Sequence, residues 1–194
     1  MTQANDIIQF LSSRRSTIVK KMGDAPIDKA DLEMILKCGF RVPDHGVLGP
    51  WEVVVIDKQA GARLGRDILV PEFKAAHPDA TPEMLAFEEA RLTRGSLVLA
   101  VISKPVEHAK IPAWEMQLSA GAVCLNLVQA SIALGYAAQW VTEWTAYNSA
   151  LLAALGGDEK TDKIAGFIYL GERLEAPTER RRAEDSEAGK VRWL

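Results

Sequence analysis

The sequence has little of the material from which disulfide frameworks and metal centres are built. Only two cysteines occur, Cys38 and Cys124, and both lie in apolar stretches that are helical in pattern. Buried, unpaired thiols are the ordinary interpretation of such positions. Thiols without a pairing pattern favour a reducing compartment, so we expect a cytoplasmic protein. The three histidines are scattered along the chain, which argues against a metal site.

The sequence also shows no pattern typical of a signal peptide or of a transmembrane helix. The N-terminus lacks the basic, apolar and small-residue order of a signal peptide. No unbroken apolar run reaches the roughly 18 residues of a transmembrane helix. The net charge of −3 is mild and argues against nucleic-acid binding. We therefore expect a soluble protein with neither a membrane nor a nucleic acid as partner.

The common nucleotide and hydrolase fingerprints are absent as well. A Rossmann domain needs a glycine-rich turn after its first strand, and residues 57–61, Asp-Lys-Gln-Ala-Gly, do not supply one. The sequence has no P-loop, HExxH or CxxC motif and no nucleophile elbow. Chemistry carried by the chain's own nucleophile or metal is therefore disfavoured.

Hydrophobic periodicity divides the chain into alternating helices and strands. The length of 194 residues suits one domain, residues 1–194. Helices are expected from a cap at Asn5, from a cap at Asp28, over about 58–95 with breaks near Pro78 and Pro82, from Pro112 to Leu134, and from Asn148 to Leu155. Strands are expected over 52–57, 96–102, 136–141 and 163–170. Few strands with long helices predict an α+β layered fold.

Three groups of polar residues could bind a ligand, and each also has an ordinary explanation. Arg14-Arg15-Ser16 follows the first helix and could grip a phosphate, although surface arginine pairs are common. Arg41 and His45 flank Pro43 in a loop and could converge on one polar ligand, or Asp44 could simply cap that loop. A third group includes Asn126 in the long apolar helix, where a core hydrogen bond is the simpler interpretation.

The order of these motifs resembles the nitroreductase-like flavoproteins. The matching motifs are Arg-Arg-Ser at 14–16, Arg-x-Pro-Asp-His at 41–45, Pro-Trp at 50–51, Trp-Glu at 114–115, Ser-Ala-Gly at 119–121, Cys-Leu-Asn-Leu at 124–127, Ala-Leu-Gly-Tyr at 133–136 and Phe-Ile-Tyr-Leu-Gly at 167–171. They cover nearly the whole chain and are most similar to the short subgroup with the Pro-Asp-His loop. The resemblance implies a mainly antiparallel sheet flanked by helices, and a homodimer whose C-terminal tail extends over the partner.

The same resemblance implies an FMN-dependent oxidoreductase that uses NAD(P)H as co-substrate and reduces small acceptors such as nitroaromatics or quinones by a ping-pong mechanism. Arg14, Arg15 and Ser16 would bind the FMN phosphate and ribityl chain. Arg41 and His45 would reach that FMN from the other subunit. Residues 140–142, Trp140, Val141 and Thr142, would line the flavin. The cofactor would carry the redox chemistry, so no catalytic side chain is expected.

One departure from the resemblance concerns this flavin-lining segment. The subgroup looks to have Trp-Arg-Ser where this chain has Trp140, Val141 and Thr142. A donor and a charge are therefore missing, and one of Arg180, Arg181 or Arg182 could compensate. Two other functions stay open at this point: a flavin-dependent oxidase or dehydrogenase, including flavin breakdown, and a flavin-binding or interaction protein with little turnover.

Overall fold

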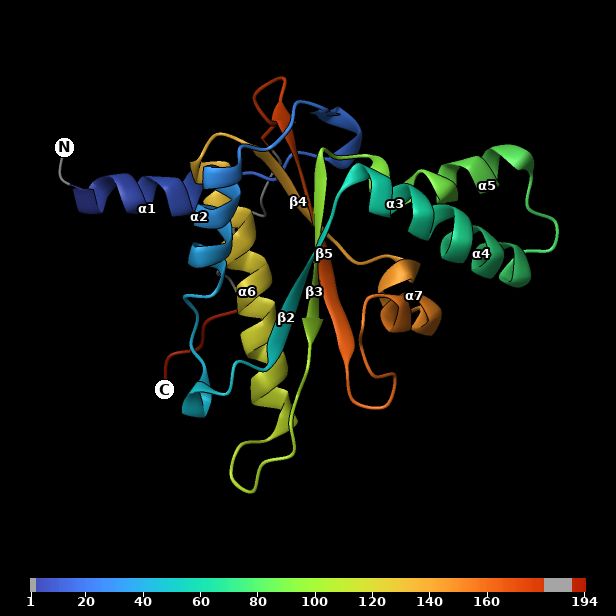
Figure 1. Cartoon of the computed structure of the whole chain (residues 1–194). Helices are drawn as coiled ribbons and strands as arrows, with labels where there is room; N and C mark the ends of the chain where they lie inside the picture. The colour runs from blue at the N-terminus through green and yellow to red at the C-terminus, as the bar shows by residue number, and fades with distance from the viewer. Residues whose placement is uncertain (1–2, 180–189) are drawn as a thin grey trace.

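The computed structural model describes residues 3–179 and 190–194, and its central sheet lies between two layers of helices (Figure 1). The helices are α1 (Gln3–Ser13), α2 (Lys29–Gly39), α3 (Lys58–Leu64), α4 (Val70–Ala76), α5 (Pro82–Glu89), α6 (Ala113–Ala133) and α7 (Ser149–Ala154). Shorter turns are η1 (Val19–Lys21), η2 (His45–Val47), η3 (Gly65–Leu69), η4 (Arg91–Thr93) and η5 (Trp144–Tyr147). The strands are β1 (Met22–Gly23), β2 (Trp51–Ile56), β3 (Leu97–Ser103), β4 (Ala137–Val141) and β5 (Lys163–Arg173).

Strand β5 is the central strand of an antiparallel sheet. Strand β3 pairs with one edge of β5, and β2 continues the sheet beyond β3. The other edge of β5 pairs with β4, where Trp140 lies opposite Ile168, and the two residues of β1 pair with the end of β5 at Glu172 and Arg173. Successive β5 neighbours therefore come from distant parts of the chain.

The two faces of the sheet form two hydrophobic clusters. Along β3, Val98, Ala100 and Ile102 face the layer that contains α3, η3, η4 and α7. Leu99 and Val101 alternate with them and face α2 and α6. All five side chains are fully buried, which explains why β3 is a continuous apolar run rather than an alternating one. Figure 1 shows α2 and α6 on one side of the sheet and α3, α4, α5 and α7 on the other.

The structure confirms the α+β class and most predicted elements, with corrections at their ends. The expected cap at Asn5 is wrong, because α1 already begins at Gln3 and Asn5 lies inside it. The last strand does not end at Leu170 but continues to Arg173, where it pairs with β1, a strand that sequence analysis missed. The cap at Asp28 is confirmed, since its carboxylate accepts hydrogen bonds from the backbone amides of Ala30 and Asp31.

Helix α6 is more apolar than the sequence analysis expected. In the described part of the chain it is long and apolar enough, by length and composition alone, to cross a membrane. The criterion of an unbroken apolar run missed it, because mean hydropathy tolerates isolated polar residues such as Asn126. Half of this apolar window is buried inside the molecule, and the helix contacts α2, β3, β4 and β5. Its place in the core therefore accounts for the buried half of this composition.

The Asp28 cap provides a test of the fold. Replacing Asp28 with Ala removes both acceptor bonds to the first turn of α2, and we expect the free energy of unfolding to fall by about 1 kcal/mol. Asp28→Asn keeps a side-chain oxygen and should stay close to wild type. Urea denaturation at one fixed protein concentration measures both variants. Equal losses in the two variants would show that the carboxylate charge, and not the cap, stabilises this helix.

Candidate functional site

The residues 14–16 and the strand β4 together form a pocket. We call it the Arg14–Ser16 pocket; its volume is about 430 Å³. It is lined by Arg14, Arg15, Ser16, Thr17, Ile18, Lys21, Gln139, Trp140, Glu175, Pro177, Thr178 and Glu179. Two hydrogen bonds set the segment after α1 beside β4: the Thr17 amide donates to the Ala138 carbonyl (3.1 Å), and the Val19 amide donates to Gln139 Oε1 (2.7 Å). Four of the eight predicted site residues therefore meet in one place.

The pocket has a surplus of hydrogen-bond donors at its basic end. Lys21 Nζ pairs with Glu175 at 2.6 Å, and Arg15 Nε lies 3.4 Å from Glu179. The Arg15 side chain is only 22% exposed. Its Nε is buried and has no hydrogen-bond partner among the described residues. A buried charged donor of this kind favours an anionic ligand that can approach it from the pocket.

Trp140 also lines the pocket, and its orientation is determined by β5. Its indole Nε1 donates to the Ala165 carbonyl at 3.1 Å. The ring lies where a side chain on Gly166 would be, so only glycine at that position leaves room for it. Trp140 therefore presents an aromatic surface whose polar atom is already bonded. Val141 packs against the core, Thr142 is exposed, and neither lines the pocket.

The Arg41–His45 loop lies at a second hollow, of about 290 Å³, which we call the His45 hollow. It is lined by Pro43, His45, Glu115, Leu118, Ser119 and Ala122. His45 Nδ1 is 2.7 Å from Glu115 Oε2. Arg41 is exposed and lines neither hollow. Within one chain, the two predicted halves of the site are thus separate.

Three polar side chains hold this loop in place. Asn126 Nδ2 donates to the carbonyls of Arg41 (3.0 Å) and Cys38 (3.3 Å), so the predicted hydrogen bond of Asn126 is confirmed. Ser119 Oγ donates to the Pro43 carbonyl at 2.6 Å. The Asp44 carboxylate accepts from the amides of Leu48 and Gly49, as expected of a loop cap. Helix α6 thus supports the loop, and Asn126 and Ser119 do so through their spacing on one face.

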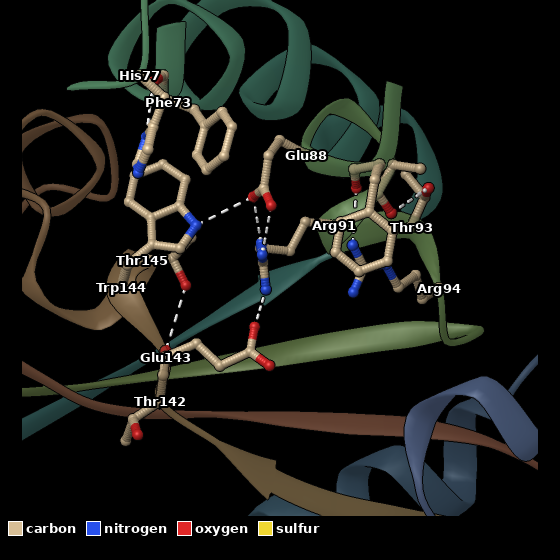
Figure 2. Close-up of polar contacts among 12 residues, drawn as sticks. Phe73, His77, Glu88, Arg91, Thr93, Arg94, Thr142, Glu143, Trp144 and Thr145 are labelled. Carbon is tan, nitrogen blue, oxygen red and sulfur yellow. Dashed lines mark hydrogen bonds and ion pairs between the residues drawn. The ribbon is translucent and has the colours of Figure 1, made fainter. Parts of the chain in front are cut away.

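Sequence reasoning missed a buried ion pair behind the turn that follows β4. Arg91 donates from Nε and Nη2 to the two carboxylate oxygens of Glu88, each at 2.6 Å, and both side chains are buried. Arg91 also contacts the carboxylate of Glu143, and Trp144 Nε1 donates to Glu88 at 3.0 Å (Figure 2). An acid and an arginine three residues apart look like an exposed helical pair in sequence, so only the structure could reveal their burial.

The buried cysteine, Cys124, does not supply a reactive thiolate at neutral pH. Burial raises the pKa of the Cys124 thiol to about 12, so the sulfur stays protonated and is a poor nucleophile. In residues 3–179 and 190–194, no three His, Cys, Asp or Glu side chains are grouped so that they could hold a metal ion. The groups that face the pockets are therefore suited to binding and positioning a ligand.

Comparisons with known proteins agree with this geometry. The model of the family described as "Nitroreductase family" matches residues 11–172. "Putative NAD(P)H nitroreductase YdjA" of Escherichia coli K12 is 30% identical over 168 residues, which are 86% of this chain and 87% of that protein. Among solved structures, a nitroreductase-like family protein from Bacillus cereus has a TM-score of 0.79 at 19% identity and covers 100% of this chain and 98% of its own. A nitroreductase with bound FMN from Bacteroides fragilis has a TM-score of 0.70 at 18% identity, with 98% and 99% coverage.

The family match spans most of the chain, and the solved structures share its layered fold. The resemblance seen in the motif order is therefore confirmed: this chain is an oxidoreductase that belongs to the nitroreductase family.

Proposed function

We propose that this chain is an FMN-dependent NAD(P)H oxidoreductase that reduces small acceptors such as nitroaromatics or quinones. The observation that carries the proposal is the Arg14–Ser16 pocket, which two arginines and a hydroxyl line together with the aromatic ring of Trp140. A phosphate end and a flat aromatic end are what a flavin mononucleotide requires. The names of the relative in E. coli and of the FMN-bound structure from B. fragilis point to the same cofactor chemistry.

The pocket fits FMN by the chemistry of its donors. Its volume of about 430 Å³ lies in the range of roughly 300–1,000 Å³ that is usual for cofactor sites. Arg15 Nε is a buried donor without a hydrogen-bond acceptor among the described residues, and a phosphate oxygen would supply one. Arg14 and Ser16 line the same end. Glu179 would have to give way to the phosphate, because two anions cannot share one guanidinium at close range without repulsion.

Bound there, FMN would supply the redox chemistry by accepting a hydride from NAD(P)H and passing electrons to an acceptor. The chain's own residues would bind and orient the cofactor. Trp140 would offer its ring surface, since its Nε1 is already bonded to Ala165. Val141 lies where the resemblance implies an arginine, so this chain places an apolar side chain at that position. The compensation suggested for Arg180, Arg181 or Arg182 lies outside the described residues.

We propose that the working unit is a homodimer in which Arg41 and His45 complete the partner's site. In the single chain these residues lie at the His45 hollow and not at the Arg14–Ser16 pocket. Large apolar side chains are exposed on two helices: Ile7, Ile8 and Leu11 on α1, and Trp114, Leu118 and Leu125 on α6. Exposed apolar surface of this extent is typical of an interface. Trp193 is 91% exposed, as an anchor for a partner would be in an isolated chain.

The proposal also includes a reducing, cytoplasmic location and one shared space for NAD(P)H and the acceptor. Neither Cys38 nor Cys124 is in a disulfide, which supports the location. The sequence has no glycine-rich motif that would hold a nicotinamide nucleotide permanently. NAD(P)H would therefore enter and leave as a substrate, and the acceptor would use the same space afterwards.

FMN titration tests the cofactor assignment. The wild-type protein should bind FMN at micromolar concentration or below. Arg14→Ala and Arg15→Ala should each weaken binding by about ten- to a hundredfold, because losing a hydrogen bond to a charged group costs roughly 1.5–3 kcal/mol. Arg66→Ala, an exposed arginine paired with Asp67, is the control and should bind like wild type. A wild-type protein that takes up no FMN would rule out the proposed function.

A mixed dimer tests whether Arg41 and His45 act across the interface. One subunit carries Arg14→Ala and Arg15→Ala, and the other carries Arg41→Ala and His45→Ala. Two different affinity tags isolate the heterodimer. If each site takes its two halves from opposite chains, one site is intact and the heterodimer should bind about half of the wild-type amount of FMN. Weak binding at both sites, with the dimer intact by sedimentation, would place the two halves in the same chain.

Steady-state kinetics test the shared space. Varying NAD(P)H at several fixed acceptor concentrations should give parallel double-reciprocal lines, because one substrate leaves before the other binds. Cys124→Ala should leave kcat within about threefold, since a thiol with a pKa of about 12 is not a nucleophile at neutral pH. Intersecting lines would show that both substrates bind together, and would reject the shared space while leaving the flavin assignment intact.

A further inference from the structure

The turn after β4 contains a residue in an unusual backbone conformation. Glu143 has φ +52° and ψ −168°, in a region that glycine enters freely and other residues rarely adopt. Such conformations persist where surrounding contacts hold them, and they concentrate at functional sites. Glu143 lies three residues after Trp140, the residue of this segment that lines the Arg14–Ser16 pocket. The contacts that hold Glu143 therefore concern the geometry of the proposed site.

The contact that holds Glu143 comes from the helical layer that contains α3, η3, η4 and α7. Its carboxylate meets the guanidinium of Arg91, which lies in η4 just after helix α5. Glu88 accepts two hydrogen bonds from the same guanidinium and a third from Trp144 Nε1. Figure 2 shows Arg91 between the two carboxylates, with the Trp144 indole directed at Glu88. Two successive residues of the turn are thus bonded to one buried ion pair.

This ion pair is itself fixed to the sheet. Tyr169 Oη donates to the Arg91 carbonyl at 3.1 Å, and Tyr169 is a residue of β5. In the sheet Tyr169 lies opposite Gln139, whose side chain lines the Arg14–Ser16 pocket and accepts the Val19 amide. Through β5, Arg91 is therefore positioned relative to the stretch of β4 that lines the pocket.

We propose that Arg91 is a positioning residue for the flavin site: by binding the Glu143 carboxylate, it keeps the turn over residues 142–144 in the conformation that FMN needs. The proposal rests on the proposed function. A purely stabilising role explains less, because a buried ion pair is seldom worth more than an apolar replacement. It also gives no reason for the third partner to be a half-exposed glutamate in a strained conformation.

Two substitutions of Glu143 distinguish the effect of its carboxylate contact with Arg91 from the effect of its positive φ. Glu143→Ala removes the carboxylate and leaves a residue that resists positive φ, so the turn should relax. Glu143→Gly removes the same carboxylate, yet glycine adopts this conformation without an anchor. We expect Glu143→Ala to weaken FMN binding about tenfold or more, and Glu143→Gly to stay within about threefold of wild type. Glu159→Ala, an exposed glutamate far along the chain, controls for the loss of one negative charge.

Three measurements on each variant decide the proposal: the Kd for FMN, the visible circular dichroism of bound FMN, and the melting temperature of the protein without FMN. Support requires a changed flavin spectrum in Glu143→Ala, its recovery in Glu143→Gly, and a lower melting temperature for the alanine variant than for the glycine variant. Equal losses in the two variants would overturn it, because the carboxylate itself would then be what FMN needs. An alanine variant identical to wild type would overturn it too.

The experiment also distinguishes this proposal from the proposed function. If the wild-type protein binds no FMN, the proposed function fails, and with it the assignment of Arg91 to a flavin site. The melting temperatures then still decide whether Arg91 holds the turn. Wild type above Glu143→Gly confirms the anchor, and equal values for these two proteins show that no anchor is needed; glycine above alanine reports only the positive φ at position 143.

Discussion

The hydrogen bonding of β5 to three other strands is the constraint on which the rest of the structure depends. Because β3 occupies one edge of β5, β4 occupies the other, and β1 pairs with the last two residues, the backbone of β5 is paired along most of its length. Its side chains are then buried on both faces, and a helical layer can pack on each. Single residues of β5 also position the site: Gly166 makes room for Trp140, and Tyr169 bonds to Arg91.

The elements that sequence analysis found are those whose signal is local. Strand β3 is a run of apolar residues, and α6 is a long apolar helix that ends just before Gly135, whose φ is +96°. Sequence patterns do not predict a strand that forms only because another strand pairs with it. Met22–Gly23 has no strand pattern of its own, and it becomes β1 only because β5 extends far enough to pair with it. The start of α1 at Gln3 was missed because Asn5, a residue type that often caps helices, indicates a later start.

The same distinction applies to the site. Arg14, Arg15 and Ser16 are consecutive, so their convergence on one ligand could be predicted from sequence, and the resemblance added Trp140. The structure brings these four residues together. The ion pair of Glu88 and Arg91 could not be predicted, because its function depends on burial and on a contact with Glu143 from a distant strand end. Helical spacing alone would place such a pair on an exposed surface.

Within the described residues, buried charged groups in the supporting structure are hydrogen-bonded, whereas one donor atom in the candidate binding site is not. Arg91 is satisfied by two carboxylates, and Asp162 is bonded to Lys104, Thr161 and the Asp158 amide. Leaving a buried donor without an acceptor costs about 1–3 kcal/mol, and more for a charged group. Arg15 Nε makes no hydrogen bond in the described structure, although it lies 3.4 Å from a Glu179 carboxylate oxygen. Ser103 Oγ and Arg173 Nε share this feature, but Ser103 is a neutral hydroxyl and Arg173 already donates twice from Nη2. Arg15 lines the Arg14–Ser16 pocket, so a ligand bound there can accept the hydrogen bond that its Nε does not make.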